Sequence, residues 1–154
     1  MKEEDIQPDK VTFLCALKAI GNLRMMIQGT LIHDSVILIG LESDVMIGNG
    51  LMHMYCSCSS FESACKVFDN MPHRDVVSWS ALVSGNVQHG FSEKAIRYFR
   101  RMQADSVSPS VITFVSNLKA CGNIGNIGGD IYWEVPKQRY PEVYLILGIA
   151  WLDM

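Results

Sequence analysis

The segment TFLCALKAIGNL at residues 12–23 recurs as TFVSNLKACGNI at residues 113–124. Seven of the twelve aligned positions are identical at an offset of 101 residues, and Pro8 matches Pro109 at the same offset. A shorter offset of 31 residues relates a second set of positions, in which Asp44, Ala64 and Phe68 align with Asp75, Ala95 and Phe99. Self-similarity at a period of about 20–50 residues is the sequence signature of repeat proteins. The sequence therefore predicts a chain of repeated units, each of about 31–36 residues.

Each unit is predicted to form two helices. Within residues 76–102, apolar side chains recur at spacings of mostly three or four residues, which is typical of amphipathic helices. Gly90 separates two such runs, and Ser92 is predicted to cap the second helix. Pro72 and Pro109 end second helices, and no alternating β pattern of comparable length is present. One helical hairpin cannot cover its own apolar face, so we expect an all-α fold, an α-solenoid of stacked antiparallel helix-turn-helix repeats.

The composition of the 154-residue chain excludes two broad classes of protein. Apolar residues make up 49% of the sequence, which is enough to fold rather than remain disordered. The longest apolar run, residues 143–152, is half of the about 20 residues that a membrane-spanning helix needs, so we expect no membrane association. Thirteen basic and 16 acidic residues give a net charge of −3, which taken alone disfavours a general phosphate-binding protein.

The sequence holds no motif for a metal, a cofactor or catalysis. Five cysteines are an odd number, and the acidic start of the chain resembles neither a signal nor a transit peptide, so we expect reduced thiols. Cys56 and Cys58 are the nearest thing to a metal-binding pair, but no second pair completes a tetrahedral site. The glycine-rich residues 122–129 lack the G-K-[ST] of a phosphate-binding loop. We therefore expect no enzyme activity, no metal, no cofactor and no small-molecule substrate.

Several segments together resemble one known family. VVSWSALVSG at residues 76–85 with EKAIRYFRRM at residues 93–102 is similar to the standard repeat of the pentatricopeptide repeat (PPR) family. VMIGNGLMHMY at residues 45–55, followed by the second-helix positions from Ala64 to Pro72, is similar to the short variant. The long variant is matched by Thr12-Phe13, Leu17-Lys18-Ala19 and Gly29-x-x-Ile32-His33. The resemblance covers residues 6–124 and points to the plant-type PLS subfamily, in which long, short and standard repeats alternate.

The resemblance also implies how the chain is divided into repeats. The predicted order is the end of a preceding repeat at residues 1–9, a long-type repeat at 10–44, a short-type repeat at 45–75, a standard repeat at 76–110, a degenerate long-type repeat at 111–144 and the start of a further truncated repeat at 145–154. The repeat at residues 111–144 is expected to be degenerate because Pro136 and Pro141 lie where the first long repeat continues through an apolar helix. The chain is thus expected to be a fragment of a longer array.

The resemblance implies single-stranded RNA as the partner, with one base per repeat recognised by a few side chains. The family places base discrimination at the fifth residue of the first helix and at the last residue of the repeat. In the short repeat these are Asn49 and Asp75, the family's usual pair for uridine. In the standard repeat they are Ser80 and Ser110, a pair that favours adenine weakly. The matching positions of the long repeat, Leu14 and Asp44, receive no base assignment.

Met46 and Val77 occupy the apolar second position, whose side chains are expected to stack on base faces. Without the resemblance, Asn49 would be interpreted as a plain polar residue near a helix start, and Met46 and Val77 as core residues. The basic residues Arg97, Arg100 and Arg101 are expected on a solvated outer face rather than at a phosphate.

Together these features predict sequence-specific single-stranded RNA binding that supports organellar RNA editing or processing. Family membership implies a mitochondrion or chloroplast and leaves room for RNA-editing or processing partner proteins. Some plant relatives carry a cytidine deaminase domain, but none of the four histidines has the glutamate two residues on that its H-x-E motif needs, and C-x-x-C is absent. The alternatives are a protein-binding α-solenoid scaffold and an inactive truncated fragment.

Overall fold

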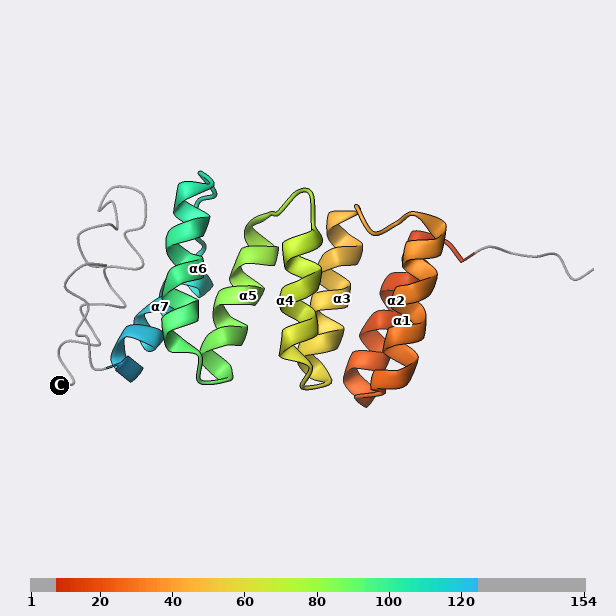
Figure 1. Ribbon diagram of the computed structural model, residues 1–154, viewed down its shortest axis with the longest axis horizontal. Coiled ribbons are helices and arrows are strands. Elements are labelled where there is room, and N and C mark those ends of the chain that lie inside the picture. The colour runs from red at the N-terminus through yellow and green to blue at the C-terminus, as the bar shows by residue number, and fades with distance from the viewer. Residues whose placement is uncertain (1–7, 125–154) are drawn as a thin grey trace, which may run out of the picture. The chain divides into compact units, whose positions relative to one another are not determined.

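The computed structural model describes residues 8–124, which form seven α-helices and no strand. The helices are α1 (Lys10–Leu23), α2 (Met26–Ile39), α3 (Val45–Ser57), α4 (Phe61–Asn70), α5 (Val76–Gln88), α6 (Ser92–Ala104) and α7 (Val111–Ile124). They belong to two compact units, Met1–Ser78 and Trp79–Met154, within which consecutive helices are joined by short loops (Figure 1). None of the described helices is long and apolar enough to cross a membrane. The all-α prediction is confirmed for the described residues.

In the first unit, α3 lies at the centre and contacts α1, α2 and α4. Met54 on α3 is fully buried, and two glycines lie against it. A Cβ atom added to Gly21 of α1 would lie 3.3 Å from the Met54 Cα, and one added to Gly29 of α2 would lie 2.8 Å from the Met54 Cε. Small residues at these two points let both helices of one hairpin approach the next helix closely. The core continues through Leu17, Val36, Leu51, Ala64 and Phe68.

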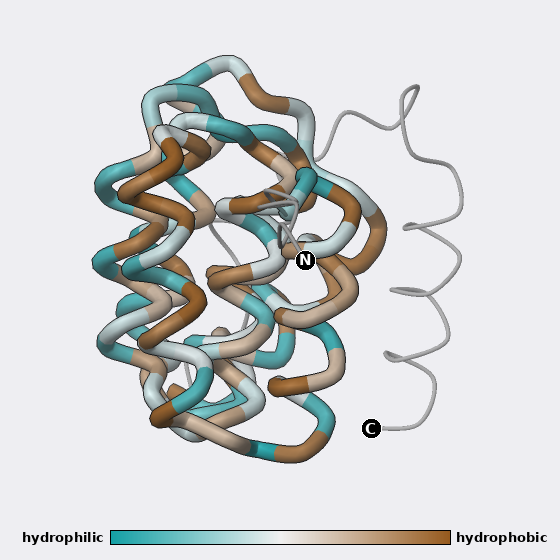
Figure 2. The backbone as a smooth tube through the Cα atoms, turned by 90° about the vertical axis from the view of Figure 1, so that its right-hand side faces the viewer, coloured by the Kyte–Doolittle hydropathy of each residue, from teal (hydrophilic) through white to brown (hydrophobic). Residues whose placement is uncertain are grey.

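In the second unit, the core is built around two aromatic rings. Phe99 of α6 and Phe114 of α7 meet edge to face, with ring centroids 5.4 Å apart. Val83 and Val87 of α5, with Ala95 of α6 and Ala120 of α7, complete the same buried cluster. Hydrophobic and hydrophilic residues alternate around the helices in Figure 2, as expected for helices that each bury one face.

The predicted cap of α6 is wrong by one residue. The N-cap is Phe91, and Ser92 is the first helical residue. Ser92 is buried, and its hydroxyl accepts a hydrogen bond from the Asn123 Nδ2 of α7 at 3.3 Å. The hydroxyl is therefore used between helices instead of at the helix start, and Gly90, with φ of +80°, makes the turn that precedes it.

Some predicted repeats extend beyond the described residues. The end of a preceding repeat at residues 1–9 is described only from Pro8, and the degenerate repeat at 111–144 only as far as Ile124. The truncated repeat at residues 145–154 lies outside the described residues altogether, as do Pro136 and Pro141.

Candidate nucleic-acid interface

The last residue of each predicted repeat hydrogen-bonds the first turn of the next helix. The Asp9 carboxylate accepts a hydrogen bond from the Thr12 N–H at 2.8 Å, before α1. In the same way the Asp44 carboxylate accepts from the Ile47 N–H at 3.1 Å, before α3. Such a cap satisfies backbone donors that have no partner within the helix. The position expected to discriminate bases therefore also has a structural task, which fixes where its side chain lies.

Asn49 and Asp75 lie side by side in the first unit, 26 residues apart in sequence. The Asn49 Nδ2 donates to the Asp75 Oδ1 at 3.3 Å, while the same Oδ1 accepts from the Ser78 N–H and the Ser78 hydroxyl, both at 2.8 Å. The Asn49 Oδ1 is buried and has no hydrogen-bond partner among the described residues. The amide nitrogen is thus the polar group that Asn49 presents beside the carboxylate.

The charge of Asp75 follows from these contacts. Partial burial acts to raise the pKa of Asp75, but hydrogen bonds from the backbone and hydroxyl of Ser78 and from Asn49 outweigh it, so the pKa lies below its usual value. The carboxylate is therefore ionised at neutral pH and acts only as a hydrogen-bond acceptor. It holds the Asn49 amide in one orientation.

Ser80 and Ser110 also meet, in the second unit. Their hydroxyl oxygens are 3.2 Å apart, and both contact the Thr113 hydroxyl, at 2.7 Å from Ser80 and 2.9 Å from Ser110. Thr113 is fully buried, and sequence reasoning missed it as a member of this group. Thr113 is the third residue of α7, and this is the position at which a capping residue usually has its hydrogen-bond partner. That position could have identified Thr113 from the sequence.

Apolar side chains next to these pairs are exposed. Met46 is 56% exposed and Val77 is 55% exposed, although both lie on helices with a buried face. Val11 and Ile112 hold the same second helical position in α1 and α7, and they are 63% and 66% exposed. The sequence analysis predicted only Met46 and Val77 as stacking residues. A comparison of the second residue of every first helix would have added Val11 and Ile112.

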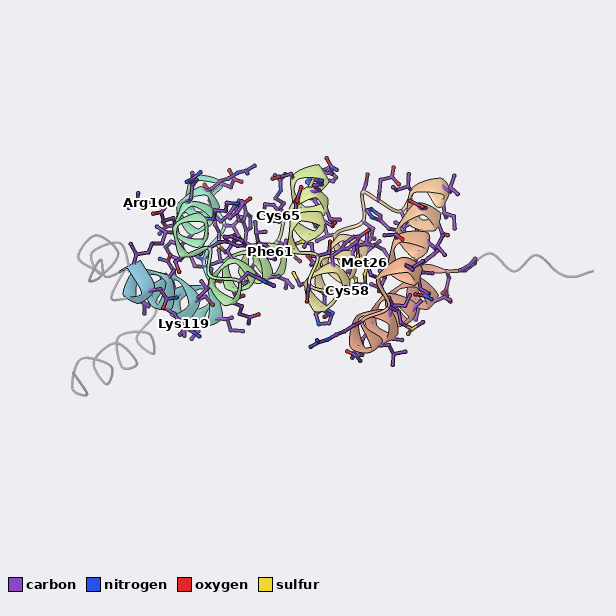
Figure 3. The ribbon with its side chains drawn as sticks, turned by 60° about the horizontal axis from the view of Figure 1, so that its bottom comes forward. Met26, Cys58, Phe61, Cys65, Arg100 and Lys119 are labelled. Carbon is purple, nitrogen blue, oxygen red and sulfur yellow. The ribbon has the colours of Figure 1, made fainter. Side chains whose placement is uncertain are left out.

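The cysteines do not form a metal centre in residues 8–124, where no group of three or more histidine, cysteine, aspartate or glutamate side chains could hold an ion. Cys58 at the end of α3 and Cys65 on α4 belong to different helices (Figure 3). Burial, followed by the charge of Cys65, raises the pKa of Cys56 to about 11. The Cys56 thiol is therefore protonated at neutral pH.

The arrangement of these helices defines a class of protein, an α-solenoid of helical repeats. Residues 49–76 and 77–107 match the model of the PPR repeat. The maize pentatricopeptide repeat protein PPR10 superposes with a TM-score of 0.69 and 28% identity, over 79% of this chain and 18% of that protein. PPR10 in complex with an 18-nucleotide psaJ RNA element gives a TM-score of 0.65. The solenoid prediction is confirmed.

Plant relatives extend this similarity. A mitochondrial pentatricopeptide repeat-containing protein of Arabidopsis thaliana is 41% identical over 130 residues, covering 84% of this chain and 19% of the relative. The chloroplastic protein CRR2 of the same plant is also 41% identical, over 79% of this chain and 19% of CRR2. The chain carries pentatricopeptide repeats and has homologues among plant pentatricopeptide repeat proteins. It spans about a fifth of the length of these relatives.

Proposed function

We propose that the chain binds single-stranded RNA in a sequence-specific manner, as part of a PPR array. The observation that carries this proposal is the hydrogen bond between Asn49 and Asp75, with exposed Met46 and Val77 close in sequence to the two partners. This combination offers a polar edge for a base and apolar surface for its faces. The similarity to PPR10, whose structure holds an RNA element, supports the same proposal.

The short repeat is proposed to select uridine. One N–H of the Asn49 amide donates to Asp75, and the second N–H is directed to a carbonyl oxygen of the base. Because Asp75 is ionised and held by Ser78, it orients the amide and prevents it from presenting an acceptor instead. Met46 and Val77 are proposed to contact the two faces of the base.

The standard repeat is proposed to favour adenine through Ser80 and Ser110. Hydroxyl groups both donate and accept, so this pair can hydrogen-bond the amino group and a ring nitrogen of one base. Thr113 contacts both hydroxyls and thereby limits their rotation. Such short side chains make fewer contacts than an amide, so we propose a weaker preference here than at Asn49.

We further propose a wider setting for this binding. The chain belongs to the PLS subfamily, with a long-type repeat at residues 10–44, a short-type repeat at 45–75 and a standard repeat at 76–110, and it acts in a mitochondrion or chloroplast, as the names of its relatives suggest. It supports RNA editing or processing by holding the transcript, has no catalysis of its own, and leaves chemistry to partner proteins. A net charge of −3 leads us to expect weak affinity for RNA.

The proposal is tested by the variants Asn49→Ala and Asp75→Asn in the full 154-residue chain. A randomised RNA pool is incubated with each protein, and the bound RNA is sequenced. The parent should enrich uridine at one nucleotide, and both variants should lose that preference there alone, a loss of about 1–3 kcal/mol of discrimination. Asparagine also caps helices well, so Asp75→Asn should leave α5 folded.

The exposed Asn70 at the end of α4 supplies the matched control, since Asn70→Ala removes the same side chain at a residue that is not one of the proposed base contacts. This variant should keep the uridine preference of the parent. Equal base profiles for the parent, Asn49→Ala and Asn70→Ala would contradict uridine recognition. A parent chain that enriches no RNA at all would instead favour the scaffold or the inactive fragment.

A further inference from the structure

Asp44 and Asp75 occupy equivalent places in two successive repeats but have different partners. The Asp75 carboxylate accepts a hydrogen bond from Asn49, the fifth residue of α3. The Asp44 carboxylate accepts one from the Lys10 ammonium, the first residue of α1, and this ion pair joins Lys10 Nζ to Asp44 Oδ2 at 2.7 Å. A donor from the first helix therefore reaches the capping carboxylate in both repeats, but from a different helical position.

The fifth residue of α1, Leu14, has a packing role. A Cβ atom added to Gly50 of α3 would lie 3.3 Å from the Leu14 Cδ2 and 3.2 Å from the Leu17 Cδ1. Leu14 thus fills the space that Gly50 leaves between α1 and α3, and its side chain has no hydrogen-bonding group. It cannot supply the donor that Asn49 supplies in the next repeat.

Lys10 is placed to take over that task. It precedes Leu14 by four residues, so both project from one face of α1. The Lys10 and Asp44 side chains are 38% and 30% exposed, which leaves the pair open to a ligand. An ammonium group has three N–H donors, and Asp44 holds one of them.

The surroundings of the pair repeat those of Asn49 and Asp75. Val11 follows Lys10 directly, and Met46 lies two residues after Asp44, just as Val77 lies two residues after Asp75. Val11 and Met46 are both exposed apolar side chains. The hydrogen bond from Lys10 is also the main reason that the pKa of Asp44 lies below its usual value, so the carboxylate is charged and keeps the ammonium in place.

We propose that Lys10 and Asp44 form a second base-recognition pair, which selects a keto base, guanine or uracil, over adenine or cytosine. Lys10 can only donate hydrogen bonds, so it is satisfied by the O6 of guanine or the O4 of uracil. Adenine and cytosine carry an amino group at that place, whose hydrogens face the ammonium. The inference rests on the proposed RNA binding and assigns a specificity to a repeat whose fifth residue is apolar.

The test uses Lys10→Met, which keeps most of the length of the side chain and removes its donors. The full 154-residue chain is again incubated with a randomised RNA pool. The nucleotide at which Asn49→Ala loses the preference for uridine serves as the reference position. The parent should favour guanine and uracil by about fivefold or more at the neighbouring nucleotide, and Lys10→Met should bring all four bases to equal frequency there. Lys10→Arg, which retains a donor-only cation, should preserve the preference.

Two results would overturn the inference. A Lys10→Met variant with the base profile of the parent would show that Lys10 takes no part in recognition. A uniform loss of affinity for every sequence, with a salt slope reduced by about one, would identify Lys10 as a phosphate contact. Loss of the uridine preference as well would point to general damage to the fold, which far-UV circular dichroism and Lys10→Arg check. If Asn49→Ala has the same base profile as the parent, the result contradicts the proposed function itself rather than the role of Lys10.

Discussion

Replacement of Phe99 by alanine is expected to lower the free energy of unfolding by about 3–5 kcal/mol, the usual cost of removing a buried aromatic ring. Phe99 is fully buried, and its ring meets Phe114 edge to face at 5.4 Å between centroids. The side chain joins α6 to α5 and α7, so its loss leaves a cavity where three helices meet. Urea denaturation followed by circular dichroism at 222 nm measures the effect.

Phe91 provides a matched control in the same unit. It is 46% exposed and precedes α6, so Phe91→Ala removes the same ring without opening a core cavity. We expect a loss below about 1 kcal/mol for this variant. Similar losses for the two phenylalanines would mean that the α5–α6–α7 core does not hold this unit together.

Met54→Ala is expected to destabilise the first unit by about 2–5 kcal/mol, because a fully buried side chain is removed from the point where α1 and α2 approach α3. Gly29→Ala should cost about 1–3 kcal/mol for the opposite reason, since the added Cβ would lie 2.8 Å from the Met54 Cε and the end of this fully buried side chain would have to shift.

The double variant separates packing from other causes. With Met54 shortened, the methyl group of Gly29→Ala enters the vacated space. The double variant should therefore lose about 1–2 kcal/mol less than the sum of the losses of the two single variants. Gly122→Ala is the control, because a Cβ there meets nothing within 4 Å and alanine favours the helix. Strictly additive losses would contradict the close packing of Gly29 against Met54. The measurement is again urea unfolding.

Much of the fold could be predicted from the sequence because it is encoded locally. The repeated spacing of Ala64 and Phe68, and of Ala95 and Phe99, reflects one buried helical face in each repeat, and all four side chains are buried. Ser92 was misplaced because a serine before a helix is the usual cap, whereas here Asn123 of a neighbouring helix hydrogen-bonds its hydroxyl. That partner is 31 residues away and leaves no trace in the local pattern.

The candidate site also contains residues that the sequence predicted and one that it did not. Its predicted members Asn49, Asp75, Ser80 and Ser110 follow from their places in a repeat, and the structure brings each pair into contact. The place of Thr113 three residues after Ser110 could have marked it as a partner of that serine. Its contact with Ser80 joins residues 33 positions apart and could not be predicted from the local sequence.

By itself the sequence determined that this chain is an all-α array of repeats and which positions recur at the start of each first helix. Periodicity carries that information because each repeat buries the same face. Only the tertiary structure decided that Met46 and Val77 are exposed and that Leu14 packs against Gly50 while Lys10 lies at Asp44. The physical reason is distance along the chain: exposure and the 34-residue contact between Lys10 and Asp44 depend on which helices lie next to one another.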